Sequence, residues 1–122
     1  MKAAKKSGRL VDFKEGVNIR VIYKGVGERP NRVEIPNSLT ALRASIGGPV
    51  GLIMFAANAA IVYAVCDLRA TQFPQEKYLP YNCSIFGRHW YGPLLLVGFD
   101  GYNFCSLTEE EMEAAENSIN GE

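Results

Sequence analysis

Hydrophobic and polar residues alternate near the start of the chain, where every second residue from Val17 to Tyr23 is hydrophobic. This period of two predicts a strand with one buried face, and with Asn18, Arg20 and Lys24 on the opposite, polar face. A loop rich in glycine and proline follows, and a second short strand is expected over Arg32–Ile35, because Pro36 ends it. The second strand is a candidate exposed edge of the sheet.

The spacing then changes to that of a helix. Leu39, Leu42 and Ile46 recur at intervals of three and four residues, which forms one apolar stripe. Asn37 is predicted to be the N-cap, because its side-chain oxygen can accept hydrogen bonds from the first free backbone amides. Two glycines follow Ile46, and glycine tolerates the left-handed conformation that ends many helices. The sequence thus predicts a short helix between them.

Residues 44–66 include no charged side chain. The apolar run is as long as the roughly 20 residues that a membrane helix needs. Glycine and proline crowd its first residues, however, and Asn58 interrupts it among small residues. These breaks favour two short strands over 50–55 and 60–65. We therefore expect a buried hairpin and no membrane span.

The second half of the chain is irregular at first. Residues 82–91 have no clear strand or helix pattern, so we expect a loop-rich segment there. Leu94–Phe99 predicts a strongly apolar strand, and a turn follows it. Thr108 and Glu111 have the spacing of a capping box, which predicts a last helix. Leu107 and Met112 have the spacing of a hydrophobic staple at the start of this helix.

This order of elements predicts an α+β protein, with a small, mainly antiparallel sheet covered by two helices. We expect a single domain over 17–122. Residues 1–16 are predicted to be a flexible basic leader, because the first ten residues carry four basic side chains and no acid. The chain end has the opposite character, with six acids and no base after Thr108.

The composition excludes several classes of protein. Lys+Arg and Asp+Glu both number 13 in 122 residues, and this balance argues against direct binding to nucleic acid. The three cysteines and the absence of an apolar signal near Met1 favour reduced thiols in a cytoplasm. His89 is the only histidine, so neither a metal site nor a cofactor is expected.

The sequence contains no phosphate-binding glycine motif and no paired carboxylates for acid–base catalysis, which leaves a cysteine nucleophile as a catalytic candidate. Cys83 and His89 lie six residues apart and could meet across a turn, with Asn82 or Asp67 orienting the imidazole. The alternative is a buried thiol beside a surface histidine. No recognised signature supports the catalytic version, so we expect no enzymatic activity.

A cluster of aromatic and polar residues is the strongest candidate site. Aromatic faces stack on planar rings, an arginine binds phosphate, and amides or imidazoles read ring edges. Such a mixture suits a nucleotide-like ligand or the centre of a protein interface. The competing interpretation is that the aromatic residues complete a small core. The candidate ligand-binding residues are Tyr81, Asn82, Arg88, His89, Trp90 and Tyr91.

Four segments resemble a known family. They read IPNSLTALRASIGG from Ile35, LPYN from Leu79, GPLLLVGFDG from Gly92 and FCSLTEEEM from Phe104. They resemble the domain of unknown function 3846 family, small proteins of phages and mobile elements. The family's usual Asn-Glu pair after the hairpin is absent, and Cys66-Asp67 stands in its place. The resemblance implies an accessory protein that works in the cytoplasm of a bacterial host.

These observations lead to one expected function and one alternative. The first is a non-enzymatic counter-defence protein that binds and sequesters a nucleotide-like signalling ligand of the host. The alternative is an inhibitor that blocks a host defence protein or nucleic-acid enzyme through its acidic last helix or an edge strand. In either case we expect a homodimer, because small sheets with open edges often pair.

Overall fold

The main sheet of the protein is antiparallel throughout. The computed structural model describes residues 16–57, 60–72, 74 and 77–120, so the expected leader lies outside the described residues except for Gly16. The strand order is β2-β1-β7-β4-β3, and β8 pairs with β7 off this path. The strands are β1 (Asn18–Lys24), β2 (Asn31–Pro36), β3 (Val50–Ala57), β4 (Ala60–Asp67), β7 (Leu94–Phe99) and β8 (Phe104–Cys105).

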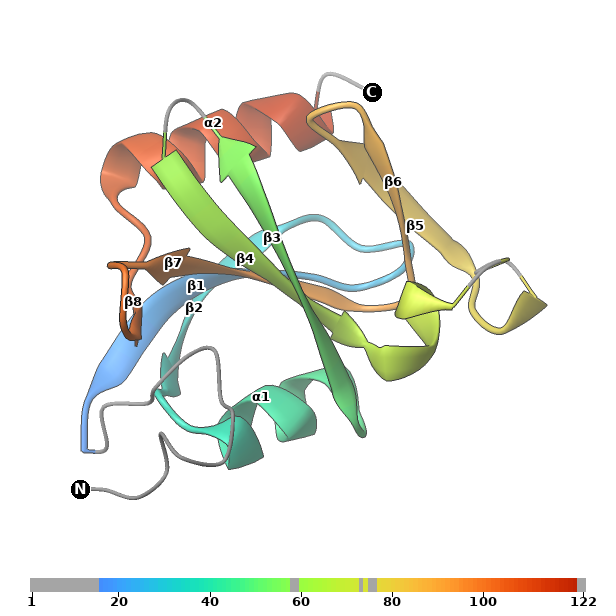
Figure 1. The fold of residues 1–122 in the computed structure, drawn as a ribbon. Helices are drawn as coiled ribbons and strands as arrows, with labels where there is room; N and C mark the ends of the chain where they lie inside the picture. Colours follow the sequence, from blue (N-terminus) through green and yellow to red (C-terminus); the bar gives the residue numbers. More distant parts are fainter. Residues whose placement is uncertain (1–15, 58–59, 73, 75–76, 121–122) are drawn as a thin grey trace.

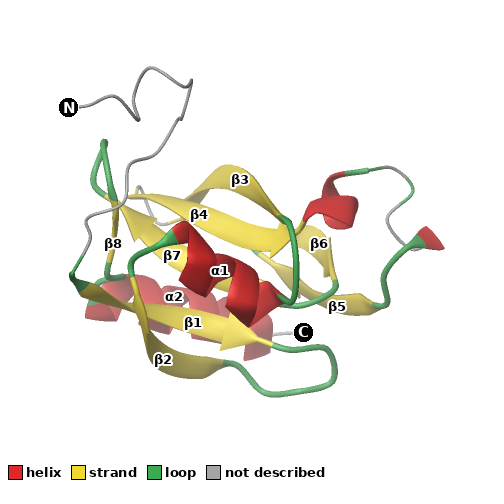
Figure 2. Ribbon diagram, turned by 90° about the horizontal axis from the view of Figure 1, so that it is seen from below, coloured by secondary structure: helices red, strands yellow, loops and turns green. Residues whose placement is uncertain are grey.

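Two helices cover opposite faces of this sheet. Helix α1 (Leu39–Ile46) lies below it in Figure 1 and α2 (Glu109–Asn120) above it. Figure 2, seen from below, shows α1 in front of the sheet and α2 behind it. The expected α+β fold, a mainly antiparallel sheet with two covering helices, is therefore confirmed.

A second, two-stranded sheet shares the α2 face. It consists of β5 (Tyr81–Ile85) and β6 (Arg88–Tyr91), and it lies beside the C-terminal end of α2 (Figure 1). The expectation that 82–91 is loop-rich is therefore wrong. Phe86 and Gly87 connect the strands, both with positive φ (51° and 80°), as in the tight turns that favour a hairpin. This turn could not be recognised from the sequence, because asparagine or glycine usually occupies the place of Phe86.

Strand β7 forms the centre of the molecule, because both of its faces are buried. Leu94 and Leu96 belong to the core cluster under α2 and the β5–β6 hairpin. Leu95 and Val97 belong to the cluster under α1. This double burial explains why Leu94–Phe99 is continuously apolar instead of alternating.

The uncharged run folds as the predicted hairpin. Strands β3 and β4 pair over their whole length, with Val50 opposite Asp67 and Ala57 opposite Ala60. Within the described part of the chain, no helix is long and apolar enough to cross a membrane. The glycine stop before this hairpin is also confirmed, since Gly47 has φ 98° and its N–H donates to Arg43 O at 2.7 Å.

The predicted N-cap of α1 is wrong by one residue. Ser38 caps the helix, and its hydroxyl accepts from Ala41 N at 3.1 Å. Asn37 lies between the end of β2 and the helix, and its N–H donates to Val17 O at 2.9 Å. Its side chain points elsewhere, and Nδ2 donates to Phe104 O at 2.9 Å.

The capping box of α2 is confirmed. Thr108 N donates to Glu111 Oε1 at 2.8 Å, and Glu111 N donates to Thr108 Oγ1 at 3.1 Å. Leu107 and Met112 are buried in the same core cluster, as a hydrophobic staple requires. Local signals were sufficient to place this helix.

Candidate functional site

The register of the β5–β6 hairpin divides the candidate residues between two faces. Trp90 pairs with Cys83, and His89 pairs with Ser84. Because successive side chains of a strand point to opposite faces, Trp90 and His89 face opposite ways. The inner face packs on the core, and the outer face meets solvent.

Three rings gather toward the outer face: Tyr81 and His89 are exposed, whereas Tyr91 is half-buried and also packs against the core cluster under α2. The Tyr81 hydroxyl and His89 Nδ1 share a hydrogen bond of 3.2 Å, in which the donor depends on the histidine tautomer. The ring centres of Tyr81 and His89 lie 5.6 Å apart, and those of Tyr81 and Tyr91 lie 5.5 Å apart at 76°. Tyr81 is 47% exposed. We call Tyr81, His89 and Tyr91 the outer ring cluster.

Trp90 is part of the core. It is only 3% exposed and belongs to the cluster under α2. The guanidinium carbon of Arg88 lies 5.0 Å from the centre of the Trp90 ring, a cation–π contact at the margin of the hairpin. In this conformation a solvent-borne ligand cannot stack on Trp90, whereas Arg88 itself remains exposed.

Asn82 fastens the hairpin to the main sheet. Its Nδ2 donates to Lys24 O at 2.9 Å and to Gly92 O at 2.7 Å, and its Oδ1 accepts from Lys24 Nζ at 2.9 Å. Both ends of the amide are thus engaged within the protein. Asn82 therefore holds the hairpin in place, and it does not contribute to the outer ring cluster.

Lys24 is a residue that the sequence reasoning missed. The strand pattern placed it on a polar face, but it is only 7% exposed. Its ammonium donates to Gly25 O at 3.1 Å as well as to Asn82. One signal was present in the sequence: Lys24 has the same strand parity as Ile22, which lies in the core cluster under α2.

The Cys83–His89 pair is not assembled. Cys83 is buried on the inner face opposite Trp90, and His89 belongs to the outer face. Asp67, one candidate for orienting the imidazole, is instead bound by Arg69, which lowers the pKa of its carboxyl. Burial also raises the pKa of the Cys66 thiol to about 11 and raises the pKa of the Cys105 thiol. These two thiols are protonated at neutral pH and are poor nucleophiles.

The residues that the structure describes include no group of three His, Cys, Asp or Glu side chains able to hold a metal ion.

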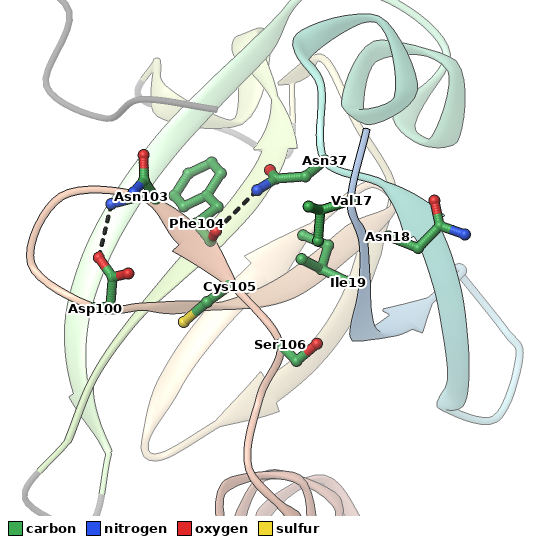
Figure 3. Close-up of a pocket in the computed structure, with 9 residues that line it drawn as sticks. All are labelled: Val17, Asn18, Ile19, Asn37, Asp100, Asn103, Phe104, Cys105 and Ser106. Atoms are coloured by element: carbon green, nitrogen blue, oxygen red, sulfur yellow. Dashed lines mark hydrogen bonds between the residues drawn. The ribbon is translucent and has the colours of Figure 1, made fainter. Parts of the chain in front are cut away.

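A small pocket lies where the sheet forks. Near the start of β7, Leu94–Leu96 pair with β1, but Gly98 and Phe99 pair with β8. A Cβ on Gly98 would lie 2.7 Å from Ser106 O, so glycine is needed for this close approach. Strand β8 enters between β7 and the start of β1, and a cavity of about 220 Å³ remains beside it (Figure 3). The cavity is lined by Val17, Asn18, Ile19, Asn37, Asp100, Asn103, Phe104, Cys105 and Ser106.

This fork pocket is rich in hydrogen-bond acceptors. Asn37 is 3% exposed, and its Oδ1 has no hydrogen-bond partner among the described residues, while its Nδ2 donates to Phe104 O (Figure 3). The Asp100 carboxylate accepts from the N–H groups of Tyr102 and Asn103, both at 2.8 Å. None of the lining residues is basic. The pocket therefore suits a group that donates hydrogen bonds better than a phosphate. No local sequence motif predicts it.

In comparisons with known proteins, no family model, no curated protein and no solved structure matches the chain. The resemblance to the domain of unknown function 3846 family accordingly stays a prediction from the four segments.

Proposed function

We propose that the protein is a non-enzymatic binding protein that captures a small nucleotide-like ligand on the outer face of the β5–β6 hairpin. The observation that carries this proposal is the outer ring cluster. The exposed rings of Tyr81 and His89 share a hydrogen bond, and the half-buried ring of Tyr91 lies edge-on to Tyr81 in the same short hairpin. Exposed aromatic rings in contact favour a planar ligand that can stack on them.

The hairpin is a firm support for such a cluster. Its inner face is anchored in the core by Cys83, Ile85 and Trp90. Its turn is tied to α2, because Phe86 N donates to Ser118 Oγ at 2.6 Å. A site that is already ordered loses less conformational entropy when it binds a ligand. Capture also requires no transition-state stabilisation, so it needs no catalytic pair.

The candidate residues then take different roles from those first expected. Tyr81, which is exposed, provides the stacking face in place of Trp90, and Tyr91 supports its ring edge-on. His89 uses Nδ1 toward Tyr81, and its Nε2 is the nitrogen assigned to a ring edge. Arg88, exposed at the margin of the hairpin, is assigned to an anionic group.

The resemblance supplies the setting of the proposal. A phage or mobile-element protein that sequesters a signalling nucleotide would weaken a host defence without catalysing a reaction. We therefore propose that the capture takes place in the cytoplasm of a bacterial host.

Thermal denaturation with added cyclic nucleotides and ADP-ribose derivatives tests the proposal. At least one ligand should raise the melting temperature of the wild-type protein, because a ligand that binds only the folded state stabilises it. The shift should disappear in Tyr81→Ala and persist in Tyr102→Ala, which removes an exposed tyrosine from the Asp100 turn instead. No shift with any of these ligands, or a shift that survives Tyr81→Ala, would count against capture at this hairpin.

The acidic helix is the weaker basis for a function. Arg32 binds Glu109 at 2.7 Å and Glu116 at 2.8 Å, and Glu111 belongs to the capping box. Part of the negative charge of α2 is thus neutralised by Arg32 or engaged in hydrogen bonds within the protein. This reduces the value of the helix as an imitation of nucleic-acid phosphates, so we do not base the function on it.

A further inference from the structure

The two edges of the main sheet are not equivalent. Strand β2 occupies one edge, as expected for Arg32–Ile35, and β3 occupies the other. An open edge exposes backbone N–H and C=O groups that can pair with another strand, and proteins usually protect it with charges or prolines. One of these edges is protected in this way and the other is not.

Strand β2 is the protected edge. Asn37 N donates to Val17 O, so the odd-numbered residues of β2 direct their backbone groups toward β1. The even-numbered ones therefore direct theirs outward. Pro36 and Pro30, just before the strand, have no N–H to offer there, and Arg32 and Glu34 carry charges.

Strand β3 is the open edge. Leu68 N donates to Pro49 O at 3.0 Å, so the odd-numbered residues of β3 direct their backbone groups toward β4. Leu52 and Met54 therefore direct their N–H and C=O groups outward. The strand contains no proline and no charged residue, and the uncharged run extends over 44–66.

The side chains beside this edge are also exposed. Leu52 and Met54 pair with Val65 and Tyr63 of β4, which face the core cluster under α1. Helix α1 covers that face only in part, because Met54 remains 55% exposed, and Leu52 and Ile61 are exposed as well. Within the described part of the chain, an unpaired backbone edge and an apolar stripe thus lie side by side.

We infer that a second copy of this chain pairs along β3, with the two β3 strands antiparallel about a two-fold axis near Ile53. In such a pair a strand meets its own sequence, and a strand without charges places no like charges opposite each other. Leu52 of one copy then lies opposite Met54 of the other, and both apolar side chains leave water. A partner that recognises charge would find none over 44–66. The interface goes beyond the proposed ligand capture and does not depend on it.

Sedimentation equilibrium of the full chain at micromolar concentration tests this interface. The wild-type protein should have twice the monomer mass of 13.4 kDa. Met54→Lys should halve the measured mass, because each lysine would place its ammonium beside the apolar Leu52 of the other copy and diagonally across the two-fold axis from the second ammonium. Tyr102→Lys is the matched control, since it adds the same charge at an exposed aromatic position outside β3, and it should remain dimeric.

A second variant keeps the test decisive if the lysine disturbs folding. Met54→Pro removes an N–H that points outward, so it costs no hydrogen bond of the β3–β4 ladder, and it should also be monomeric. Circular dichroism establishes that each variant is folded. A monomeric wild type, or a folded Met54 variant that stays dimeric, would overturn the inference whatever the ligand experiments show.

Discussion

The ammonium of Lys24 lies 2.9 Å from Oδ1 of Asn82, and the amide of Asn82 donates back to Lys24 O at the same distance. This reciprocal pair joins β1 to the β5–β6 hairpin across 58 residues of sequence. Lys24 is buried, and its hydrogen-bond acceptors are neutral. A buried charge is costly unless it is hydrogen-bonded, so the amide of Asn82 carries much of the stability at this junction.

Asn82→Ala should therefore destabilise the protein strongly. The change removes an acceptor from a buried ammonium and two donors from backbone carbonyls. We expect a loss of about 3 kcal/mol in the free energy of unfolding, measured by urea denaturation.

Lys24→Met in the Asn82→Ala background provides the control for that prediction. Methionine retains much of the apolar stem and removes the charge, so part of the lost stability should return. The sum of the stability losses of the two single variants should then differ from the loss of the double variant by a clear coupling energy. Simple additivity would show that Asn82 acts through its hydrogen bonds to the backbone carbonyls of Lys24 and Gly92, and not through the Lys24 ammonium.

These cases show which features the sequence could predict. The glycine stop after Ile46 and the capping box at Thr108 depend on neighbouring residues, and both were predicted correctly. The N-cap was not, because the N–H of Asn37 is taken by Val17, which no local pattern reveals. Lys24 was misplaced for the same reason, since its partner Asn82 lies far along the chain.

The candidate site was predicted in composition but not in arrangement. Its residues do occupy one hairpin, yet their division into an outer ring cluster and a buried Trp90 follows from strand parity. That parity could not be assigned while 82–91 was treated as a loop. The fork pocket could not be predicted at all, because β8 is only two residues long and reaches β1 through tertiary contacts.

A second prediction concerns the pH dependence of stability. Arg32 binds Glu116 with two nitrogens, both at 2.8 Å, and this pairing lowers the pKa of the Glu116 carboxyl. The unfolded chain therefore takes up a proton at a higher pH than the folded protein. The pair stabilises the fold above the ordinary glutamate pKa, and this contribution is lost as the pH falls through the lower folded pKa.

Arg32→Met should reveal this contribution. At pH 7 the variant should be less stable than the wild type, and the difference should shrink between about pH 5 and pH 3 as Glu116 becomes protonated. Denaturation at several pH values measures it, and high salt should also reduce the difference, because the pair is partly exposed. A difference that is constant from pH 7 to pH 3 would assign the effect to packing of the arginine stem.

A third prediction concerns thiol reactivity. Burial raises the pKa of Cys66 to about 11, and Cys66 is fully covered, whereas Cys105 is half-buried with a pKa that burial also raises. At pH 8 the native protein should react slowly with an aromatic disulfide reagent, and Cys105 should be modified before Cys66. Unfolded protein is the control and should release three equivalents of the aromatic thiolate at once, one for each cysteine. Rapid modification of Cys66 in the native state would contradict its place in the core.

The last prediction concerns the turn of the binding hairpin. Phe86 has φ 51°, a left-handed conformation that a bulky side chain rarely adopts, and Gly87 follows with φ 80°. Asparagine followed by glycine is the preferred pair in such turns, so Phe86→Asn should raise the free energy of unfolding by about 1 kcal/mol. The backbone N–H that donates to Ser118 Oγ is retained in this variant.

Gly87→Ala serves as the opposite control and should be destabilising, because alanine is strained at the same positive φ. Guanidinium denaturation of both variants measures the two changes. Phe86→Asn should also keep any ligand-induced rise in melting temperature, since Phe86 is not part of the outer ring cluster. A loss of stability in Phe86→Asn would mean that packing of the phenyl ring outweighs the strain of its backbone.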